Sequence, residues 1–353
     1  LAPLAHLCLP LVGLGAFYDG SVVRPAHEVL DEMGWEPLAL GPKEGLALLN
    51  GTQFIAAYAV HNLIRFKSLL DHADIAGAMS LEGILGSASP FDEDLHNLRP
   101  YDGTRLVAAR IRSLLEGSEM VESHLHCDRV QDPYSFRCMP QVHGASRNAW
   151  QHLHDLTMVE INSVTDNPVI FADKVISGGN FHGQPLAMAL DYCAVAASEI
   201  GSISDRRIYQ LLDGEPFGLP PSLMKNTGTN SGFMMPQYTS AALVSENKSF
   251  CYPASADSIP TSLGQEDHVS MGSISGRKLA MILDNLHQIL AIELLCAAQA
   301  FDYRRPLKSG PLLDVCHDLI RDVIDHAEED RIFADDIRAM AGLISSGRLL
   351  ALA

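Results

Sequence analysis

Three titratable residues, Glu266, Asp267 and His268, stand together after Gln265 and before a long apolar run. The turn-rich residues 257–262 precede them, so the cluster lies where a loop gives way to an expected helix. Unpaired backbone N–H groups and the positive end of the helix dipole favour a carboxylate or an anionic ligand at such a junction. The residue types alone leave two interpretations open, a catalytic or binding site and a helix N-cap.

A second group of chemically capable residues, Gln131, Tyr134 and Arg137, surrounds Pro133. Helical backbone is disfavoured before a proline, so an irregular segment can point an amide, a phenol and a guanidinium the same way. Arginine forms a planar fork for a carboxylate, and tyrosine can donate or accept a proton. The trio suits recognition of an amino acid or carboxylic acid, although a surface turn capped by Arg137 would have the same sequence.

The glycine-rich residues 177–183 do not match the G-x-x-x-x-G-K-S/T pattern of a phosphate-binding loop, and no Lys or Arg is closer than Lys174. We interpret them as a tight turn that brings backbone and the ring of Phe181 close to a ligand, or as a plain turn before a helix. Metal-ligand residue types occur at 124–128 and 152–155. Histidines two apart in a helix point to different faces, so we expect no metal site.

Composition narrows the class of partner. The 43 acidic and 25 basic residues give a net charge of -18, which argues against nucleic acid and anionic membranes and favours a small molecule. The seven scattered cysteines, without a C-x-x-C pair, are typical of reduced thiols in the cytoplasm. Neither a G-x-S-x-G nucleophile elbow nor a dinucleotide-binding G-x-G-x-x-G follows a strand, so hydrolase and dehydrogenase functions lose their usual support.

Long helical periods separated by short breaks predict an all-α fold. The helix from residue 268 would be about 50 Å long and is apolar on every face, so neighbouring helices must surround it. We therefore expect a single helical domain over residues 1–353, built as a long-helix central bundle, with homo-oligomer contacts and one small hairpin near 169–176. The expected helices cover residues 44–70, 101–124, 141–163, 182–213, 232–250, 268–303, 312–326 and 331–343.

The first 17 residues carry no Lys, Arg, Asp or Glu, and they lack the basic start of a signal peptide. Two prolines and two glycines interrupt them, so we expect a buried core segment and no membrane span. The chain also begins with Leu1. We expect it to be the downstream portion of a longer protein.

Seven segments, in order along nearly the whole chain, strongly resemble the histidine ammonia-lyase branch of the aromatic amino acid lyase family. These segments are residues 1–6, 44–52, 130–138, 162–168, 178–183, 230–234 and 265–272. The resemblance implies a mostly helical homotetramer and an electrophilic 4-methylideneimidazol-5-one cofactor made from an internal Ala-Ser-Gly. That tripeptide is absent from the 353 residues. It is expected just upstream of Leu1, in an N-terminal segment of the same protein, so the isolated fragment should be inactive.

The resemblance also assigns roles to individual residues. It implies that Arg137 holds the substrate carboxylate, with Gln131 and Asn167 assisting through hydrogen bonds. It places Tyr134 near the cofactor and the transferring protons, and Phe181 against the cofactor or the substrate. Because long helices separate their ends by tens of ångströms, we expect some of these residues to meet across subunits.

Glu266 decides the expected substrate, with Gln265 and Met234 as further substrate-binding candidates. Plant phenylalanine lyases carry Asn-Gln-Asp where this chain has Gln265 to Asp267, and a neutral amide suits an apolar ring. A carboxylate suits imidazole, because it accepts the N–H and balances positive charge. The expected reaction is non-oxidative deamination of L-histidine to trans-urocanate and ammonia. Two alternatives stay open, a tyrosine or phenylalanine ammonia-lyase or aminomutase, and a catalytically inactive helical assembly module.

Overall fold

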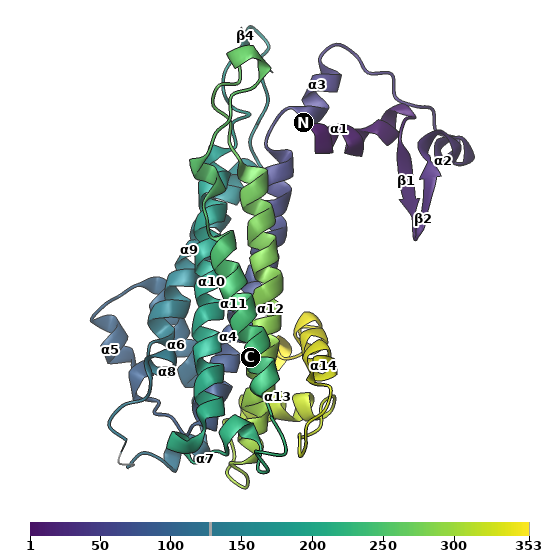
Figure 1. The fold of residues 1–353 in the computed structure, drawn as a ribbon. Helices are drawn as coiled ribbons and strands as arrows, with labels where there is room; N and C mark the ends of the chain where they lie inside the picture. Colours follow the sequence, from purple (N-terminus) through teal and green to yellow (C-terminus); the bar gives the residue numbers. More distant parts are fainter. Residues whose placement is uncertain (127–128, 353) are drawn as a thin grey trace.

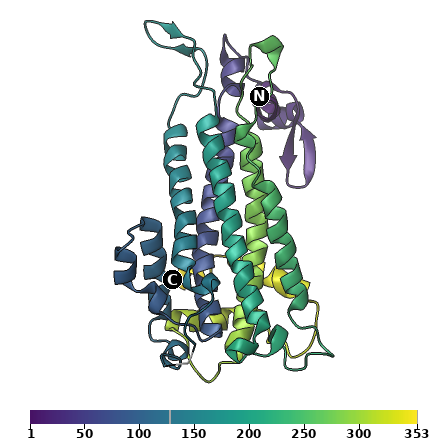
Figure 2. The ribbon, with the colours of Figure 1, turned by 60° about the vertical axis from the view of Figure 1, so that its left-hand side comes forward.

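Long helices run side by side and form one bundle (Figure 1, Figure 2). The computed structural model describes residues 1–126 and 129–352. α10 and α12 pack closely on each other and on α4, which confirms the predicted all-α bundle. The long helices are α4 (Gln53–Gly83), α9 (Met139–Glu160), α10 (Gln184–Asp213), α11 (Met234–Phe250) and α12 (Gly272–Asp302).

The second half of α12 lies at the centre of the bundle. Every residue from Ile289 to Phe301 is buried, on all faces of the helix. Small residues allow the neighbouring helix to approach closely, since a Cβ added to Gly83 of α4 would lie 3.0 Å from the Cβ of Ala300. A helix that is apolar on every face must be covered by others, as the sequence predicted.

The bundle has two different ends. At the α8 end, α4, α10 and α12 finish, and short helices close the structure: α5 (Glu93–Asn97), α6 (Asp102–Leu115), α7 (Glu119–Glu122), α8 (Tyr134–Arg137), α13 (Pro311–Arg321) and α14 (Phe333–Ser345). At the loop end, α9 and α11 finish, and residues 161–183 and 251–271 form the connections. Single turns of 3-10 helix occur at Leu9–Val12, Ser89–Phe91, Glu215–Phe217, Pro221–Leu223, Ala254–Ala256, Ser262–Gly264 and Leu350–Leu352.

The N-terminal residues form an arm that stands beside the loop end of the bundle (Figure 1). It contains α1 (Ala2–Cys8), β1 (Ala16–Asp19), β2 (Val22–Pro25), α2 (Ala26–Met33) and α3 (Glu44–Leu49).

The prediction that residues 1–17 are buried in the core is wrong. Leu1 is 66% and Leu7 is 73% exposed, although Leu4 and Pro10 are buried. The lack of charged residues indicates that a segment is suited to burial, but it does not identify the part of the protein that buries it. In this chain, the bundle does not cover residues 1–17.

The strands of the described residues form two hairpins. The predicted hairpin near 169–176 is confirmed as β3 (Val169–Ile170) paired antiparallel with β4 (Val175–Ile176). The β1–β2 hairpin was missed, although Asp19-Gly20 between apolar residues is a hairpin signal. Gly20 has φ +62, a left-handed conformation that glycine adopts readily.

Several helix boundaries differ from the prediction, and three of the expected helices differ for local reasons. The helix expected over 44–70 is broken at Gly51, whose φ of +138 and close approach to the Thr165 carbonyl suit only glycine, and α4 then continues to Gly83. The helix expected over 101–124 ends at Leu115, before Gly117 with φ +75. α12 begins at Gly272 instead of His268, because the preceding residues are tied to the loop.

α10 and α12 are each long and apolar enough to cross a membrane by length and composition alone. In both helices 67% of the apolar stretch is buried inside the bundle, as in the core helix of a soluble protein. The length and apolar composition of these two helices are therefore only weak evidence for a membrane span.

Candidate active site

α8 brings together the three polar residues predicted around Pro133. Pro133 precedes this single helical turn, and Phe136 in the middle of it is buried in the core. Arg137 Nη2 donates a 2.9 Å hydrogen bond to Gln131 Oε1. The Arg137 guanidinium also lies over the ring of Tyr134, with 4.5 Å between Cζ and the ring centroid. Phe136 anchors the turn in the core, whereas Tyr134 is 70% exposed and Arg137 is half-buried.

A pocket of about 650 Å³ opens beside this turn, and Gln131 and Arg137 line it. Arg129 lines it too and forms a 3.2 Å ion pair with Asp132. The Arg137 Nε is buried and has no hydrogen-bond partner among residues 1–126 and 129–352. The guanidinium of Arg137 carries only donors, so a ligand with acceptor oxygens suits the pocket that it lines. A carboxylate matches the planar fork of Arg137.

Asn167 organises the glycine-rich turn at the loop end. Its Oδ1 accepts hydrogen bonds from the backbone N–H of Gly178, at 2.8 Å, and from Ser177 Oγ, at 3.2 Å. Phe181 follows in this turn and is 40% exposed. Because the Asn167 oxygen holds the turn, this side chain would contact a ligand by donating an N–H. The ring of Phe181 offers an apolar face.

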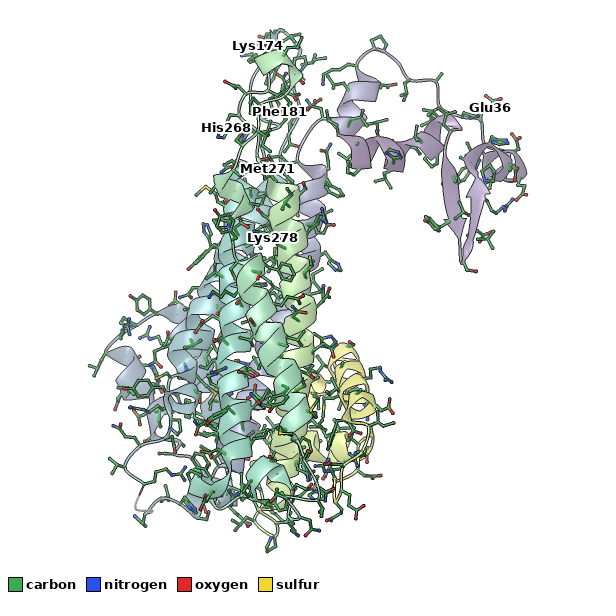
Figure 3. All side chains as sticks on the ribbon, viewed as in Figure 1. Glu36, Lys174, Phe181, His268, Met271 and Lys278 are labelled. Atoms are coloured by element: carbon green, nitrogen blue, oxygen red, sulfur yellow. The ribbon has the colours of Figure 1, made fainter. Side chains whose placement is uncertain are left out.

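The Phe181 turn meets the loop that carries Glu266. His182 and His268 stack with 5.3 Å between ring centroids, and His182 Nε2 lies 3.2 Å from His268 Nδ1. Figure 3 places Phe181, His268 and Met271 together at this end of the bundle. Segments 86 residues apart therefore form one surface.

Glu266 is exposed and is held by its own loop. Its Oε2 accepts hydrogen bonds from Thr261 Oγ1, at 2.8 Å, and from Ser262 Oγ, at 2.9 Å. These bonds lower the pKa of the Glu266 carboxyl, so it is ionised at neutral pH. The alternative that Glu266 caps α12 is wrong, since the helix begins six residues later at Gly272. Gln265 precedes it in the same turn and is also exposed.

The candidate residues thus form two groups at opposite ends of one chain. α12 connects the ends through 31 residues, which is roughly 45 Å at about 1.5 Å per residue. Gln131, Tyr134 and Arg137 lie at the α8 end, and half-buried Met234 begins α11 there. Asn167, Phe181, Gln265 and Glu266 lie at the loop end. A single copy does not bring Arg137 close to Glu266.

The sequence reasoning gave no role to several residues that shape the loop end. Asn50 Nδ2 donates to Asp166 Oδ1, at 3.0 Å, and to the Asn167 carbonyl, at 3.2 Å. Lys43 forms an ion pair with the same Asp166. The Asn50-Gly51-Thr52 motif was the available signal. Through Asn50 and Lys43, the arm is linked to Asp166 and Asn167, beside the glycine-rich turn.

Metal-ligating side chains do not gather in the part of the chain that the structure describes. Of the run 124–128, Cys127 and Asp128 lie outside the described residues. The six described cysteines are free thiols.

Comparison with known proteins identifies the family of this chain. The model of the aromatic amino acid lyase family matches residues 1–322. The chain belongs to this family. The lyase chain is 50% identical to the histidine ammonia-lyase of Myxococcus xanthus, over 99% of this chain and 70% of that protein. It is 49% identical to the histidine ammonia-lyase of Natranaerobius thermophilus, over 99% of this chain and 69% of that protein.

Solved structures agree with the fold of the lyase chain. The histidine ammonia-lyase of Trypanosoma cruzi superposes with a TM-score of 0.93 at 44% identity, over 100% of this chain and 68% of that one. A tyrosine aminomutase from Streptomyces globisporus gives 0.95 at 35% identity, over 100% of this chain and 71% of that one. The resemblance and the all-α fold expected from the sequence are confirmed.

Proposed function

We propose that this chain contributes the substrate-binding side chains of an enzyme that deaminates L-histidine to trans-urocanate and ammonia. The observation that carries this proposal is the ionised carboxylate of Glu266, presented on an exposed loop of a chain about 50% identical to histidine ammonia-lyases. An imidazole N–H can donate to this carboxylate, whereas the phenyl ring of phenylalanine has no N–H or O–H to donate.

Membership of the family implies a methylideneimidazolone-type cofactor. Bound in the site, such a group supplies an electrophile that turns the amino acid into a better substrate for elimination. This is needed because ammonia is a poor leaving group and the β-hydrogen is weakly acidic. The residues present fit such a planar group, since the ring of Phe181 is 40% exposed on a turn held by Asn167. We propose that the Ala-Ser-Gly that forms it lies upstream of Leu1.

Arg137 holds the substrate carboxylate in this proposal. Arg137 lines a pocket large enough for an amino acid. Gln131 already accepts from Arg137 Nη2, which fixes the guanidinium plane before substrate binds. Tyr134 lies directly beside this carboxylate position and is 70% exposed. Its phenol can exchange a proton with the bound substrate.

Glu266 holds the imidazole or exchanges a proton with the substrate. Its hydrogen bonds from Thr261 and Ser262 keep it charged and oriented. Roughly 45 Å of α12 separates it from Arg137 in one chain. We therefore propose that the site forms between copies, in a homotetramer, with the α8 end of one copy against the loop end of another. We also propose a cytoplasmic location.

A related activity on tyrosine or phenylalanine is the nearest second candidate. The tyrosine aminomutase of Streptomyces globisporus superposes with a TM-score of 0.95. Activity assays distinguish the two. The polypeptide including its upstream segment is purified, and urocanate absorbance and ammonia release are measured with histidine, tyrosine and phenylalanine. We expect turnover of histidine alone. Turnover of tyrosine or phenylalanine in preference to histidine would contradict the proposal.

A second assay separates the enzyme from an inactive assembly module. A polypeptide that begins at Leu1 encodes no Ala-Ser-Gly, so we expect it to make no urocanate. Restoring the upstream segment should restore turnover. Urocanate made by the purified 353-residue chain alone would refute this assignment of the cofactor. If both polypeptides assemble and neither deaminates any of the three amino acids, the chain is an assembly module.

A further inference from the structure

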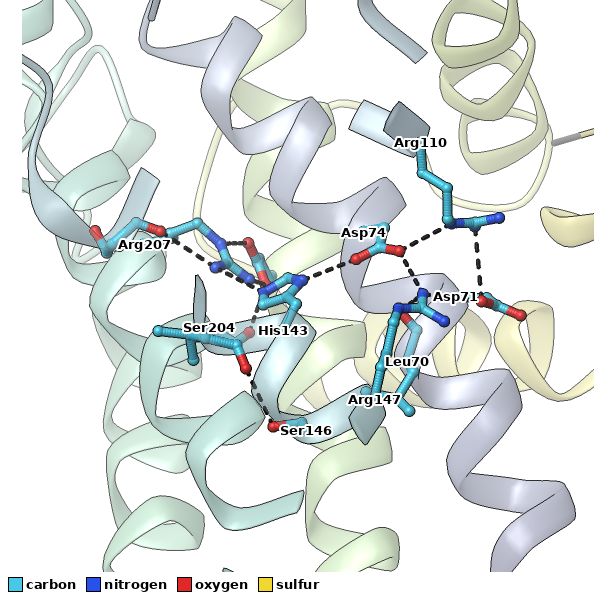
Figure 4. A network of polar contacts seen from close by, with 12 residues as sticks. Leu70, Asp71, Asp74, Arg110, His143, Ser146, Arg147, Ser204 and Arg207 are labelled. Atoms are coloured by element: carbon cyan, nitrogen blue, oxygen red, sulfur yellow. Dashed lines mark hydrogen bonds and ion pairs between the residues drawn. The ribbon is translucent and has the colours of Figure 1, made fainter. Parts of the chain in front are cut away.

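Arg207 is one of the largest fully buried side chains of the protein, and its partners lie on three elements, α8, α9 and α12 (Figure 4). It extends from α10 and binds Glu293 of α12 through two bonds, Nε to Oε1 at 2.5 Å and Nη2 to Oε2 at 2.9 Å. Glu293 also accepts from Ser80 Oγ, at 2.9 Å, and Ser204 Oγ, at 2.5 Å. A buried ion pair this well satisfied holds a fixed geometry.

The remaining donor of Arg207 reaches α8. Arg207 Nη1 donates a 3.3 Å hydrogen bond to the carbonyl oxygen of Ser135, which lies between Tyr134 and Arg137. α8 is a single turn of four residues, and helices this short are not stable by themselves. Its position therefore depends on outside contacts. The buried ring of Phe136 supplies one, and the Arg207 hydrogen bond supplies another.

His143 contacts the same guanidinium nitrogen that donates to Ser135. Its Nε2 lies 3.4 Å from Arg207 Nη1, and its Nδ1 lies 2.9 Å from Asp74 Oδ1. Burial lowers the pKa of His143, which favours a neutral ring that donates to Asp74 and accepts from Arg207. Asp74 is itself paired with Arg147 and with Arg110, the latter at 2.9 Å. The network leaves the guanidinium little freedom to turn.

Gly77 of α4 makes room for this arrangement. A Cβ added there would lie 2.4 Å from Met139 Sδ, at the start of α9, and 3.6 Å from Arg207 Cζ. The absence of a side chain lets the start of α9 and the guanidinium approach α4 closely.

We propose that Arg207 and Glu293 are positioning residues for the reaction. They set the place of α8 through the Ser135 carbonyl, and so the place of the Arg137 guanidinium and the Tyr134 phenol. Neither residue touches the substrate. The inference rests on the proposed function, which gives Arg137 and Tyr134 their roles.

The test removes both charges together, in the polypeptide that includes its upstream segment. Arg207→Met with Glu293→Gln leaves no unpaired charge in the core, so the melting temperature should change little. Without the bond to Ser135, α8 should shift. A misplacement of about 1 Å can cost roughly 100-fold in rate, so we expect kcat/KM to fall about 10- to 100-fold, with a raised KM and a lowered kcat. Arg207→Lys keeps the charge but not the fork and should recover part of the loss.

Ser146→Ala is the matched control. It removes a buried side-chain bond to a backbone carbonyl, Ser146 Oγ to Ala196 at 2.9 Å, in the same part of the bundle but away from α8. We expect an unchanged KM. A merely structural role for Arg207 would reduce the amount of folded protein and leave the KM of the remainder unchanged.

An unchanged KM in the double variant overturns the inference. So does a crystal structure of the double variant in which α8 has not moved. If the unaltered enzyme fails to turn over histidine, tyrosine and phenylalanine, the proposed function fails instead. The position of α8 in that crystal structure then decides the inference alone.

Discussion

The two ends of the bundle shift the pKa of a glutamate in opposite directions. At the α8 end, Glu82 is buried, and burial raises its pKa to about 7 although Ser309 and Gly310 donate to it. At the loop end, Glu266 is exposed, and hydrogen bonds from Thr261 and Ser262 lower its pKa. Residues distant in the sequence donate to Glu82, and residues four and five positions away donate to Glu266.

The two ends therefore differ in what a substitution there should affect. The α8 end is closed by its own chain, so Arg137 is fixed by Gln131 and by a turn anchored in the core. The loop end holds Glu266 in place but leaves it uncovered. Changes at the α8 end should therefore act on substrate affinity and on folding, and changes at the loop end should act mainly on catalysis.

The largest effect is expected for Arg137→Met. Removing one partner of a desolvated charge pair costs about 2–5 kcal/mol, so kcat/KM for histidine should fall about 10³-fold. Most of the loss should appear in KM, because the carboxylate is held before and during the reaction. Steady-state kinetics with histidine measure both quantities.

Arg99→Met is the control for this variant. Arg99 also stacks on a tyrosine, Tyr101, with 5.2 Å between Cζ and the ring centroid, but it is exposed and outside the 650 Å³ pocket. Its loss should leave KM unchanged. A normal KM in Arg137→Met would place the carboxylate site elsewhere.

Glu266→Gln should have the next largest effect. The substitution keeps size and hydrogen bonding but removes the charge, so kcat/KM for histidine should fall about 100-fold, within the roughly 10²- to 10⁴-fold that acid–base groups contribute. Asp257→Asn, an exposed carboxylate of the same connection, should change little. A raised KM with normal kcat would make Glu266 an imidazole anchor. Unchanged kinetics would remove the reason to prefer histidine.

Sequence reasoning succeeded where the determining contacts are local. The helices expected over 182–213 and 232–250 are Gln184–Asp213 and Met234–Phe250, because periodicity and turn residues lie within the segments themselves. The grouping of Gln131, Tyr134 and Arg137 was also accessible, since one segment of seven residues contains them.

Prediction from the sequence failed where segments distant in the chain determine the surroundings of a residue. Arg207 and Glu293 are 86 residues apart, and neither stands out in its helix. The stacking of His182 on His268, which joins the Phe181 turn to the Glu266 loop, is equally invisible in the sequence. Helix patterning indicates that a face is buried, but it does not identify the partner. The same gap explains the wrong prediction for the N-terminal arm.

The smallest effect is expected for Glu82→Gln, in the pH dependence of stability. The folded pKa of about 7 lies above the ordinary 4.5, so the contribution of Glu82 to stability is full below pH 4.5 and is lost as the pH rises through 7. That loss is on the order of 3 kcal/mol. The melting temperature of the unaltered protein should therefore fall by a few degrees between pH 5 and pH 8 on account of this group.

Glutamine stays neutral throughout, so the fall should be smaller in Glu82→Gln, and the variant should be the more stable protein at pH 8. Calorimetry at equal protein concentration measures this. Glu93→Gln, at the same end but 75% exposed in its side chain, should follow the unaltered protein at every pH. If the melting temperature of Glu82→Gln shows the same pH dependence as that of the unaltered protein, burial does not control the pKa of the Glu82 carboxyl. The α8 end would then be as open to water as the loop end, and the contrast between the two ends would disappear.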